Sequence, residues 1–225
     1  SVNNGTNDAC GIDTLFLSKY DFDCASVPND STWLYGVDNN GNIDSCLATI
    51  NVFDTINPVI ACQSIDLYLD STGMASILPE DIDDNSSDAC GIDTLYLSMY
   101  DFDCANLGDN AVTLYGMDVN GNLDSCIATV NVIDSIAPVT LCTDTTIYLD
   151  LTGNFSIDTT YINNGSNDAC GIDTLFLSQY DFDCSNVGSN NDTLFAVDGS
   201  GNIGFCVATI TVIDSIAPDV IPGDI

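Results

Sequence analysis

Apolar and polar residues alternate with a period of two in several short stretches of the chain. The alternation is clearest over residues 92–98, 112–118 and 126–133, and shorter stretches run over 65–69 and 74–78. β-Branched and aromatic residues fill these stretches, whereas Gly, Asn, Asp and Pro separate them. Both features predict short antiparallel strands. No segment shows a period of 3.6 residues, so we expect an all-β fold of small sandwiches.

This pattern recurs every 80 residues without an insertion or deletion. The segment NDACGIDTLFLSKYDFDC returns as SDACGIDTLYLSMYDFDC and again as NDACGIDTLFLSQYDFDC. A fixed period is typical of arrays that reuse one module, whereas an enzyme needs a single asymmetric site. The repeat therefore indicates a structural or adhesive protein.

Three Asp-Ser/Thr-Ile-x-Pro segments, at 54–58, 134–138 and 214–218, look like stiff linkers between modules. They predict complete modules at 54–133 and 134–213, an incomplete module at 1–53 that lacks its first strands, and a linker, further unit or inter-subunit connection at 214–225. Missing strands leave an open sheet edge, which can accept a strand from elsewhere. Two interpretations stay open: the chain is an excerpt from a longer array, or a neighbouring copy completes the first module.

The charge balance narrows the possible partners. The 225 residues include 34 Asp and Glu but one basic residue, Lys19, which gives a formal net charge of −33. This charge excludes binding to a nucleic-acid backbone and disfavours attraction to an anionic membrane. No stretch of about 18 or more apolar residues is present, so no membrane insertion is expected. The 45% hydrophobic content falls in regular alternation, which indicates a folded protein.

The chain has 11 cysteines, a density that fits an oxidising, extracellular location. The spacing suggests one pair that closes a short loop in each repeat: Cys10–Cys24, Cys90–Cys104 and Cys170–Cys184. We expect Cys62–Cys126 and Cys142–Cys206 to tie the first strand of a module to its last. The alternative pair Cys126–Cys142 would cross a linker and leave Cys206 alone, because position 222 is proline. The expected scheme leaves Cys46 unpaired, since its partner would lie in the absent strands.

Two groups of oxygen-bearing side chains are candidate Ca²⁺ ligands. The first group lies in the turns and comprises Asp38, Asn40, Asn42 and Asp44, with Asp118, Asn120, Asn122 and Asp124 one repeat later. An ordinary Asn-Gly hairpin turn is the alternative interpretation. The second group combines Asp88, Asp93, Asp101 and Asp103 with the linker residue Asp134 at a joint between modules. Its alternative is a solvated acidic face.

The runs DACGID, YDFDC, VDNNGNIDSCLATINVFD and INPVIAC together resemble the HYR (hyalin repeat) domain, in the tandem form found in surface proteins of Bacteroidetes. The resemblance recurs three times and covers nearly the whole chain. It implies an immunoglobulin-like β-sandwich, secretion, and an adhesive or structural role. One departure is that the usual Cys-Pro after the linker reads Cys62-Gln63 and Cys142-Thr143.

Covalent glycans are a further expectation. The pattern of Asp followed by Ser or Thr and then a small or aliphatic residue is an O-glycan acceptor in Bacteroidetes. It occurs at Thr14, Ser31, Thr55, Ser71, Thr94, Ser135, Thr145, Thr159, Thr174, Thr193 and Ser215. Asn-x-Ser/Thr sequons occur at Asn4, Asn29, Asn85, Asn154, Asn164 and Asn191. Strand alternation places Phe16, Tyr96 and Phe176 beside acceptors, where they stack on a sugar or pack against a neighbouring module.

The sequence contains no His, no Gly-x-Ser-x-Gly and no phosphate-binding loop, so no enzyme is expected. We expect a secreted or cell-surface stalk or filament whose partners are copies of itself or neighbouring repeats. The alternative is an adhesin that binds carbohydrate or a cell-surface protein. Its specific surface would be the segment in which the repeats diverge, which is expected as a loop at 26–33, 106–113 and 186–193.

Overall fold

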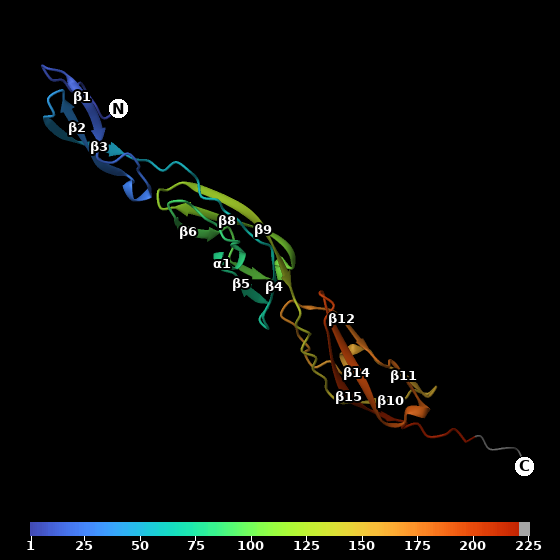
Figure 1. Cartoon of the computed structure of the whole chain (residues 1–225). Helices are drawn as coiled ribbons and strands as arrows, with labels where there is room; N and C mark the ends of the chain where they lie inside the picture. The colour runs from blue at the N-terminus through green and yellow to red at the C-terminus, as the bar shows by residue number, and fades with distance from the viewer. Residues whose placement is uncertain (221–225) are drawn as a thin grey trace, which may run out of the picture. The chain divides into compact units, whose positions relative to one another are not determined.

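The computed structural model describes residues 1–220 and is all-β, as the alternation predicts, with tandem sandwiches of the immunoglobulin-like kind that the resemblance implies (Figure 1). The chain forms two compact units. Unit 1 comprises Ser1–Gln63, Leu78–Ser98 and Val112–Ala128, and unit 2 comprises Ser64–Ile77, Met99–Ala111 and the chain from Thr129 onward. Each unit thus takes part of the second repeat, and the module boundaries stay a prediction.

The first repeat forms one three-stranded sheet, drawn in blue in Figure 1. Its strands are β1 (Ile12–Leu17), β2 (Asn29–Asp38) and β3 (Ile43–Asn51), antiparallel in the order β1-β2-β3. A 3-10 helix, Cys24–Ser26, follows β1. Within residues 1–220 no strand pairs with the outer edge of β3.

The third repeat has the strands that the first repeat lacks. Its main sheet contains β10 (Thr145–Tyr148), β15 (Ile203–Ile213), β14 (Gly188–Asp198) and β12 (Ile172–Leu177) in that order, with β10 parallel to β15. The second sheet pairs β11 (Asn154–Ser156) with β13 (Asp181–Asp183). Two 3-10 helices, Thr159–Tyr161 and Cys184–Asn186, complete the repeat.

The second repeat has the same strand order, and its strands β8 (Gly108–Asp118) and β9 (Leu123–Ile133) run through both units. In unit 1, β6 (Ile92–Leu97) pairs with β8. In unit 2, β4 (Ile65–Tyr68) pairs with β9, and β5 (Met74–Ser76) pairs with β7 (Asp101–Asp103). The α-helix α1 (Pro79–Ile82) is a single turn with proline at its first position, and a 3-10 helix covers Cys104–Asn106.

Alternate residues of the long strands fill the core of the third repeat. Inward-facing side chains of β10, β12, β13, β14 and β15 form one cluster, including Ile147, Leu177, Phe182, Leu194 and Ile210. Ile210 and Val212 are 0% and 1% exposed, whereas Ile50 and Val52 at the same positions of the first repeat are only half-buried. The first repeat lacks a counterpart of β10 to cover them.

One expectation is corrected, and two short strands were not predicted. The divergent segments 26–33, 106–113 and 186–193 are mostly paired strand and not loop, since β2, β8 and β14 begin at residues 29, 108 and 188. The short strands β7 and β13 are too short, at three residues each, to show alternation in the sequence.

Candidate functional site

Two disulfides join neighbouring repeats. Cys24 of the first repeat pairs with Cys90 of the second, and Cys104 of the second pairs with Cys170 of the third. The Cα atoms are 5.2 Å apart in both pairs, and both pairs span 66 residues. The first joint lies within unit 1 and the second within unit 2. A disulfide therefore links the two neighbouring repeats at each joint.

The prediction of a disulfide within each short loop is wrong: Cys10–Cys24, Cys90–Cys104 and Cys170–Cys184 do not form. Strand β6 starts two residues after Cys90 and is six residues long. An extended strand of this length carries the chain about 20 Å away. Since a disulfide needs Cα atoms within about 7 Å, proximity in sequence does not bring the sulfurs together.

The other two predicted disulfides are confirmed. Cys62 pairs with Cys126, with Cα atoms 6.1 Å apart, and Cys142 pairs with Cys206, with Cα atoms 5.9 Å apart. Each ties the segment before the first strand of a repeat to the last strand. Three exposed cysteines are free: Cys10, Cys46 and Cys184. The Pro222 on which the pairing argument drew lies outside the described residues.

The linker residue Asp54 is held at the first joint by the turn between β8 and β9. Its Oδ2 accepts a hydrogen bond from Asn120 Nδ2 at 3.0 Å, and its carbonyl oxygen accepts one from Asn122 Nδ2 at 3.3 Å. Its Oδ1 accepts the backbone N–H of Ile56 at 3.0 Å. Both carboxylate oxygens of Asp54 therefore have a donor.

At the second joint, Asp134 occupies the place of Asp54 with one difference. Asn202 Nδ2 donates to its carbonyl oxygen at 3.1 Å, and the N–H of Ile136 donates to its Oδ1 at 3.0 Å. The residue aligned with Asn120 is Ser200. Its short side chain has no amide that could donate a hydrogen bond to Asp134 Oδ2. Asp134 is 7% exposed, and its Oδ2 is buried without a hydrogen-bond partner.

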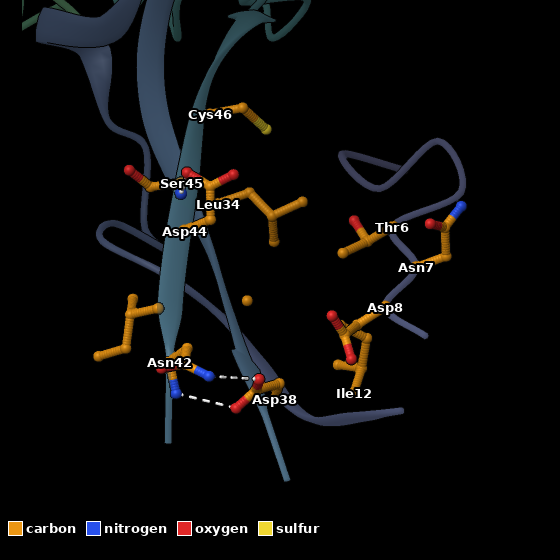
Figure 2. Close-up of a pocket in the computed structure, with 12 residues that line it drawn as sticks. Thr6, Asn7, Asp8, Ile12, Leu34, Asp38, Asn42, Asp44, Ser45 and Cys46 are labelled. Carbon is orange, nitrogen blue, oxygen red and sulfur yellow. Dashed lines mark hydrogen bonds between the residues drawn. The ribbon is translucent and has the colours of Figure 1, made fainter. Parts of the chain in front are cut away.

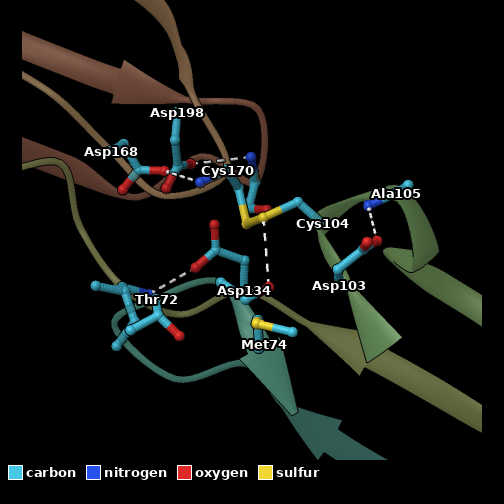
Figure 3. Close-up of a disulfide and its surroundings, with 12 residues drawn as sticks. Thr72, Met74, Asp103, Cys104, Ala105, Asp134, Asp168, Cys170 and Asp198 are labelled. Carbon is cyan, nitrogen blue, oxygen red and sulfur yellow. Dashed lines mark hydrogen bonds between the residues drawn. A yellow bond between two sulfur atoms is a disulfide. The ribbon is translucent and has the colours of Figure 1, made fainter. Parts of the chain in front are cut away.

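A second carboxylate lies close to the Asp134 side chain. Side-chain ligand atoms of Asp134, Asp168 and Cys170 lie within 4.8 Å of one another (Figure 3). The Cys170 sulfur is bonded to Cys104, so the two carboxylates are the potential ligands. Two neighbouring carboxylates, one of them with an oxygen that lacks a partner, fit a hard cation such as Ca²⁺, which takes oxygen ligands in flexible geometry. Asp54, Asp88 and Cys90 form the matching group at the first joint.

Within the described residues, no two members of the second predicted metal cluster share a group of candidate ligands. In residues 1–220, Asp88 and Asp134 belong to separate groups of candidate ligands, and Asp93, Asp101 and Asp103 belong to neither. Asp103 caps a 3-10 helix by accepting the N–H of Ala105 at 2.8 Å. Asp93 accepts the hydroxyl of Thr94 at 3.1 Å. The sequence prediction missed Asp54 and Asp168, although the 80-residue period relates them to Asp134 and Asp88.

The turn carboxylates bind donors of their own turn. Asp118 is 1% exposed, its Oδ1 accepts the N–H groups of Asn120 and Asn122 at 2.9 and 2.8 Å, and its Oδ2 accepts Asn122 Nδ2 at 2.7 Å. Burial raises the pKa of Asp118, but the donors of Asn122, Asn120 and Gly121 together hold it below its usual value. The half-buried Asp38 bonds in the same way, chiefly to the amide of Asn42, which lowers its pKa. Asp44 and Asp124 instead accept the N–H of the following serine at 2.8 Å.

Eight of the eleven expected O-glycan acceptors are exposed, and Thr145, Thr159 and Thr193 are half-buried. Each long sheet also has a stacked aromatic pair on its exposed face. One ring of each pair lies two residues after an expected acceptor threonine on the same strand. Phe16 stacks on Tyr35 with ring centroids 5.0 Å apart, and the pairs Tyr96–Tyr115 and Phe176–Phe195 stack at 4.9 Å. Cross-strand stacking thus accounts for one face of each ring, and Phe16, Tyr96 and Phe176 remain 37–41% exposed.

The first repeat has an open groove beside the edge strand β3. Its volume is about 330 Å³, and its lining includes Thr6, Asn7, Leu34, Gly36 and Cys46 (Figure 2). In the second repeat, the corresponding space is filled by the segment that follows the linker: Ile60 lies against Gly116, the counterpart of Gly36. The groove is therefore the position that a linker segment would occupy.

No protein-family model and no curated protein matches the chain, so the HYR resemblance stays a prediction. The chain is similar to solved protocadherin structures at low scores. Extracellular cadherin domains 1–4 of protocadherin gamma B7 are 14% identical at a TM-score of 0.35, and the alignment covers 85% of this chain and 59% of that one. Domains EC1-2 of human protocadherin-24 are 13% identical at 0.39, with 72% and 100% covered. The chain spans 37% of the protocadherin gammaB4 extracellular domain, at 15% identity, a TM-score of 0.38 and 84% coverage of this chain. Scores this low carry no argument about fold or function.

No helix in the described part of the chain is long and apolar enough to cross a membrane.

Proposed function

We propose that the chain is an extracellular structural repeat protein that forms a surface stalk or filament. The observation that carries the proposal is the disulfide at each joint, Cys24–Cys90 and Cys104–Cys170. A covalent bond between neighbouring repeats keeps them together under tension and limits bending, which a mechanical element requires. Its persistence requires an oxidising location outside the cytosol.

The adhesin alternative has less support. A specific binding surface would need a part of the chain that departs from the repeat. The divergent segments of the three repeats are the first residues of β2, β8 and β14, and those strands are paired along their length. A structural array needs no such departure, which favours the stalk or filament.

A divalent cation at the second joint fits the same role. Asp134 Oδ2 is buried without a partner, and Asp168 supplies a second carboxylate close to the Asp134 side chain. Ca²⁺ bound by these two side chains would neutralise their repulsion and stiffen the joint between the second and third repeats. The first joint has less need of an ion, because the amide of Asn120 already bonds the corresponding oxygen of Asp54.

Covalent glycans on the exposed acceptors also fit a surface filament. Thr14 and Thr94 are exposed beside the stacked pairs Phe16–Tyr35 and Tyr96–Tyr115. The uncovered face of an aromatic ring packs well against the apolar face of a sugar. A glycan there would shield the apolar outer face of the sheet. Intact-protein mass measured on material from the native source tests this point, and a mass equal to that of the polypeptide would contradict it.

Imaging of the joints tests the mechanical role. The angle between the first and second repeats is measured in electron micrographs of the oxidised chain and of a Cys24→Ser/Cys90→Ser variant. The proposal predicts a narrow distribution of angles for the oxidised chain and a wider one for the variant. A Cys46→Ser variant, which removes a cysteine outside the joint, is the matched control. Equal distributions for all three proteins would contradict the mechanical role.

A further inference from the structure

We propose that residues 214–220 of one copy of this chain dock in the open groove of the first repeat of a second copy. Cys184 of the first copy and Cys10 of the second then form a disulfide equivalent to those at the internal joints. The inference rests on the proposed function and specifies the surface and the bond that join copies head to tail.

Two earlier copies of the docking segment already pack against repeats of the same chain. Val59 and Ser87 exchange two backbone hydrogen bonds of 2.8 and 2.9 Å, and Val139 and Asn167 exchange two of 2.8 and 3.0 Å. The prolines at 58 and 138, one residue earlier, are buried. Residues 214–218 repeat the sequence of 134–138 without change, DSIAP, yet Pro218 is exposed. The third copy of the segment is thus present but has no repeat beneath it within residues 1–220.

The groove has the shape that this segment needs. A Cβ atom placed on Gly116 would lie 2.1 Å from Ile60 Cδ1, so the glycine makes room for the isoleucine of the docked segment. At the matching position of the first repeat, a Cβ on Gly36 would have Leu15 and Thr6 as its nearest neighbours, at 3.4 and 3.5 Å. The residue two periods after Ile60 is Val220, which is 81% exposed. We assign the Val220 side chain to the space over Gly36.

The repeat also fixes the polar contacts of the docked segment. Asn7 aligns with Ser87 and Asn167, so it would exchange two backbone hydrogen bonds with Asp219 of the other copy. Asn40 and Asn42 align with Asn120 and Asn122, which hold Asp54 through its Oδ2 and its carbonyl oxygen. The same two amides would hold Asp214, whose Oδ1 already accepts the N–H of Ile216 at 3.0 Å. The junction between copies therefore has the amide donor that the second internal joint lacks.

Both halves of the disulfide are preformed. The Cys184 Sγ lies 3.7 Å from the carbonyl oxygen of Gly153, as the Cys104 Sγ in the second joint lies 3.7 Å from that of Gly73. The N–H of Cys10 donates to Asp8 Oδ1 at 2.8 Å, and the N–H of Cys170 donates to Asp168 Oδ1 at the same distance. Cys10 and Cys184 are both exposed and unpaired. Each free thiol thus has the local setting of a cysteine that is bonded elsewhere in the chain.

Bond formation requires an oxidant, for which a small disulfide such as oxidised glutathione is sufficient. The Cys184 thiolate attacks one glutathione sulfur and releases one glutathione thiolate. The Cys10 thiolate then attacks the Cys184 sulfur of the mixed disulfide and releases the second glutathione. The two protons lost by the cysteines are taken up by the two released thiolates. Two cysteines are oxidised and one glutathione disulfide is reduced.

Mixing two complementary variants of the 225-residue chain tests the inference. Both carry Cys46→Ala, which removes the third free thiol. The donor also carries Cys10→Ser and keeps Cys184, and the acceptor carries Cys184→Ser and keeps Cys10. With oxidised glutathione present, the mixture is expected to yield a heterodimer about tenfold faster than either variant yields a homodimer, because docking raises the effective concentration of the thiols. Peptide mass mapping identifies the Cys184–Cys10 bond.

A substitution at Val220 distinguishes disulfide formation after docking from disulfide formation by random collision. A donor with Val220→Asp is expected to lose the tenfold advantage, whereas a donor with Val207→Asp keeps it, since Val207 is also exposed (56%) but lies on β15. Both side chains are exposed, so neither change disturbs the donor core. Homodimers as fast as heterodimers, or equal rates for the two donors, would overturn the inference. It would also be overturned if Cys10 in protein from the native source were bonded to a preceding repeat of the same polypeptide.

The two proposals can fail separately. A heterodimer that fails to form, with joints that still loosen when Cys24–Cys90 is removed, contradicts only the inference. A heterodimer that forms, with joint angles that do not respond to removal of that disulfide, contradicts only the mechanical role.

Discussion

Asn120 Nδ2 donates a 3.0 Å hydrogen bond to Oδ2 of the linker residue Asp54, and this bond has no counterpart one repeat later. There the linker residue is Asp134 and the amide is replaced by the shorter Ser200, so the same oxygen is buried without a partner. Each of the two joints has its own disulfide, and this side-chain donor is one difference between them. They form a natural pair for measuring what the donor contributes.

Restoring the amide at the second joint is expected to stabilise it. In Ser200→Asn, the new amide reaches Asp134 Oδ2, and satisfying a buried carboxylate oxygen is worth about 1–3 kcal/mol. Urea unfolding in the presence of a chelator measures the gain. The reverse change, Asn120→Ser, is the matched control and should destabilise the first joint by a similar amount. A Ser200→Asn variant no more stable than the parent would show that Asp134 Oδ2 already has a partner.

Calcium is expected to stabilise the parent chain through the second joint. Ca²⁺ bound by Asp134 and Asp168 stabilises the folded state by mass action, so the melting temperature should rise with Ca²⁺ concentration and fall on chelation. Ser200→Asn should weaken this response, since the amide occupies the oxygen that the ion would bind. Calorimetry with Ca²⁺ and with chelator measures the response. A transition that is unchanged by chelation would contradict a cation at this joint.

A second orphaned oxygen belongs to Asp192, which is 1% exposed and stands where the first repeat has Thr32 and the second has Val112. Its Oδ1 accepts the N–H of Gln179 at 3.0 Å, whereas its Oδ2 has no partner. The hydroxyl of Thr32 accepts the corresponding N–H of Lys19 at 3.1 Å without leaving an oxygen unpaired.

Asp192→Thr should therefore keep the backbone bond and remove the buried charge. We expect a gain of about 1–3 kcal/mol in unfolding free energy at pH 7, measured by urea unfolding. Asp192→Asn, which keeps the acceptor and the volume, separates the effect of charge from that of size. A loss of stability in Asp192→Thr would contradict this assignment.

Acid should weaken the first repeat through Asp30. The hydrogen bond from Lys19 Nζ, with those from Ser31 and Ser26, lowers the pKa of Asp30 from 3.8 to about 2. Because the pKa of Asp30 is lower in the folded state, ionised Asp30 stabilises the fold. This stabilisation is complete above pH 3.8 and is lost as the pH falls toward about 2. Asp30→Asn should thus lower the melting temperature at pH 7 and have little effect at pH 2. A difference of the same size at both pH values would contradict this origin.

The sequence predicted the strands well, because alternation along β8, β9, β14 and β15 directly reflects which side chains are buried. It failed on the cysteines next to β1, β6 and β12, because closeness in sequence does not imply closeness in space when an extended strand intervenes. The signal for the correct pairs was present: Cys24–Cys90 and Cys104–Cys170 have the same separation, 66 residues.

The joint itself was only partly predictable. The linker carboxylate Asp134 was expected at a joint, but its partner Asp168 lies 34 positions away and depends on how two repeats meet. The alignment of Asn120 with Ser200 is visible in the sequence. Its consequence is not, because a lost donor matters only where the acceptor is buried.

The central claim is that disulfides link neighbouring repeats. Disulfide mapping tests it most directly. The oxidised chain is digested with pepsin at acidic pH, where thiol exchange is slow, and the linked peptides are identified by mass spectrometry. Peptides that join Cys24 to Cys90 and Cys104 to Cys170 are the predicted result. Peptides that join Cys10 to Cys24, Cys90 to Cys104 and Cys170 to Cys184 would contradict it, because each repeat would then be closed on itself and no joint would be clamped.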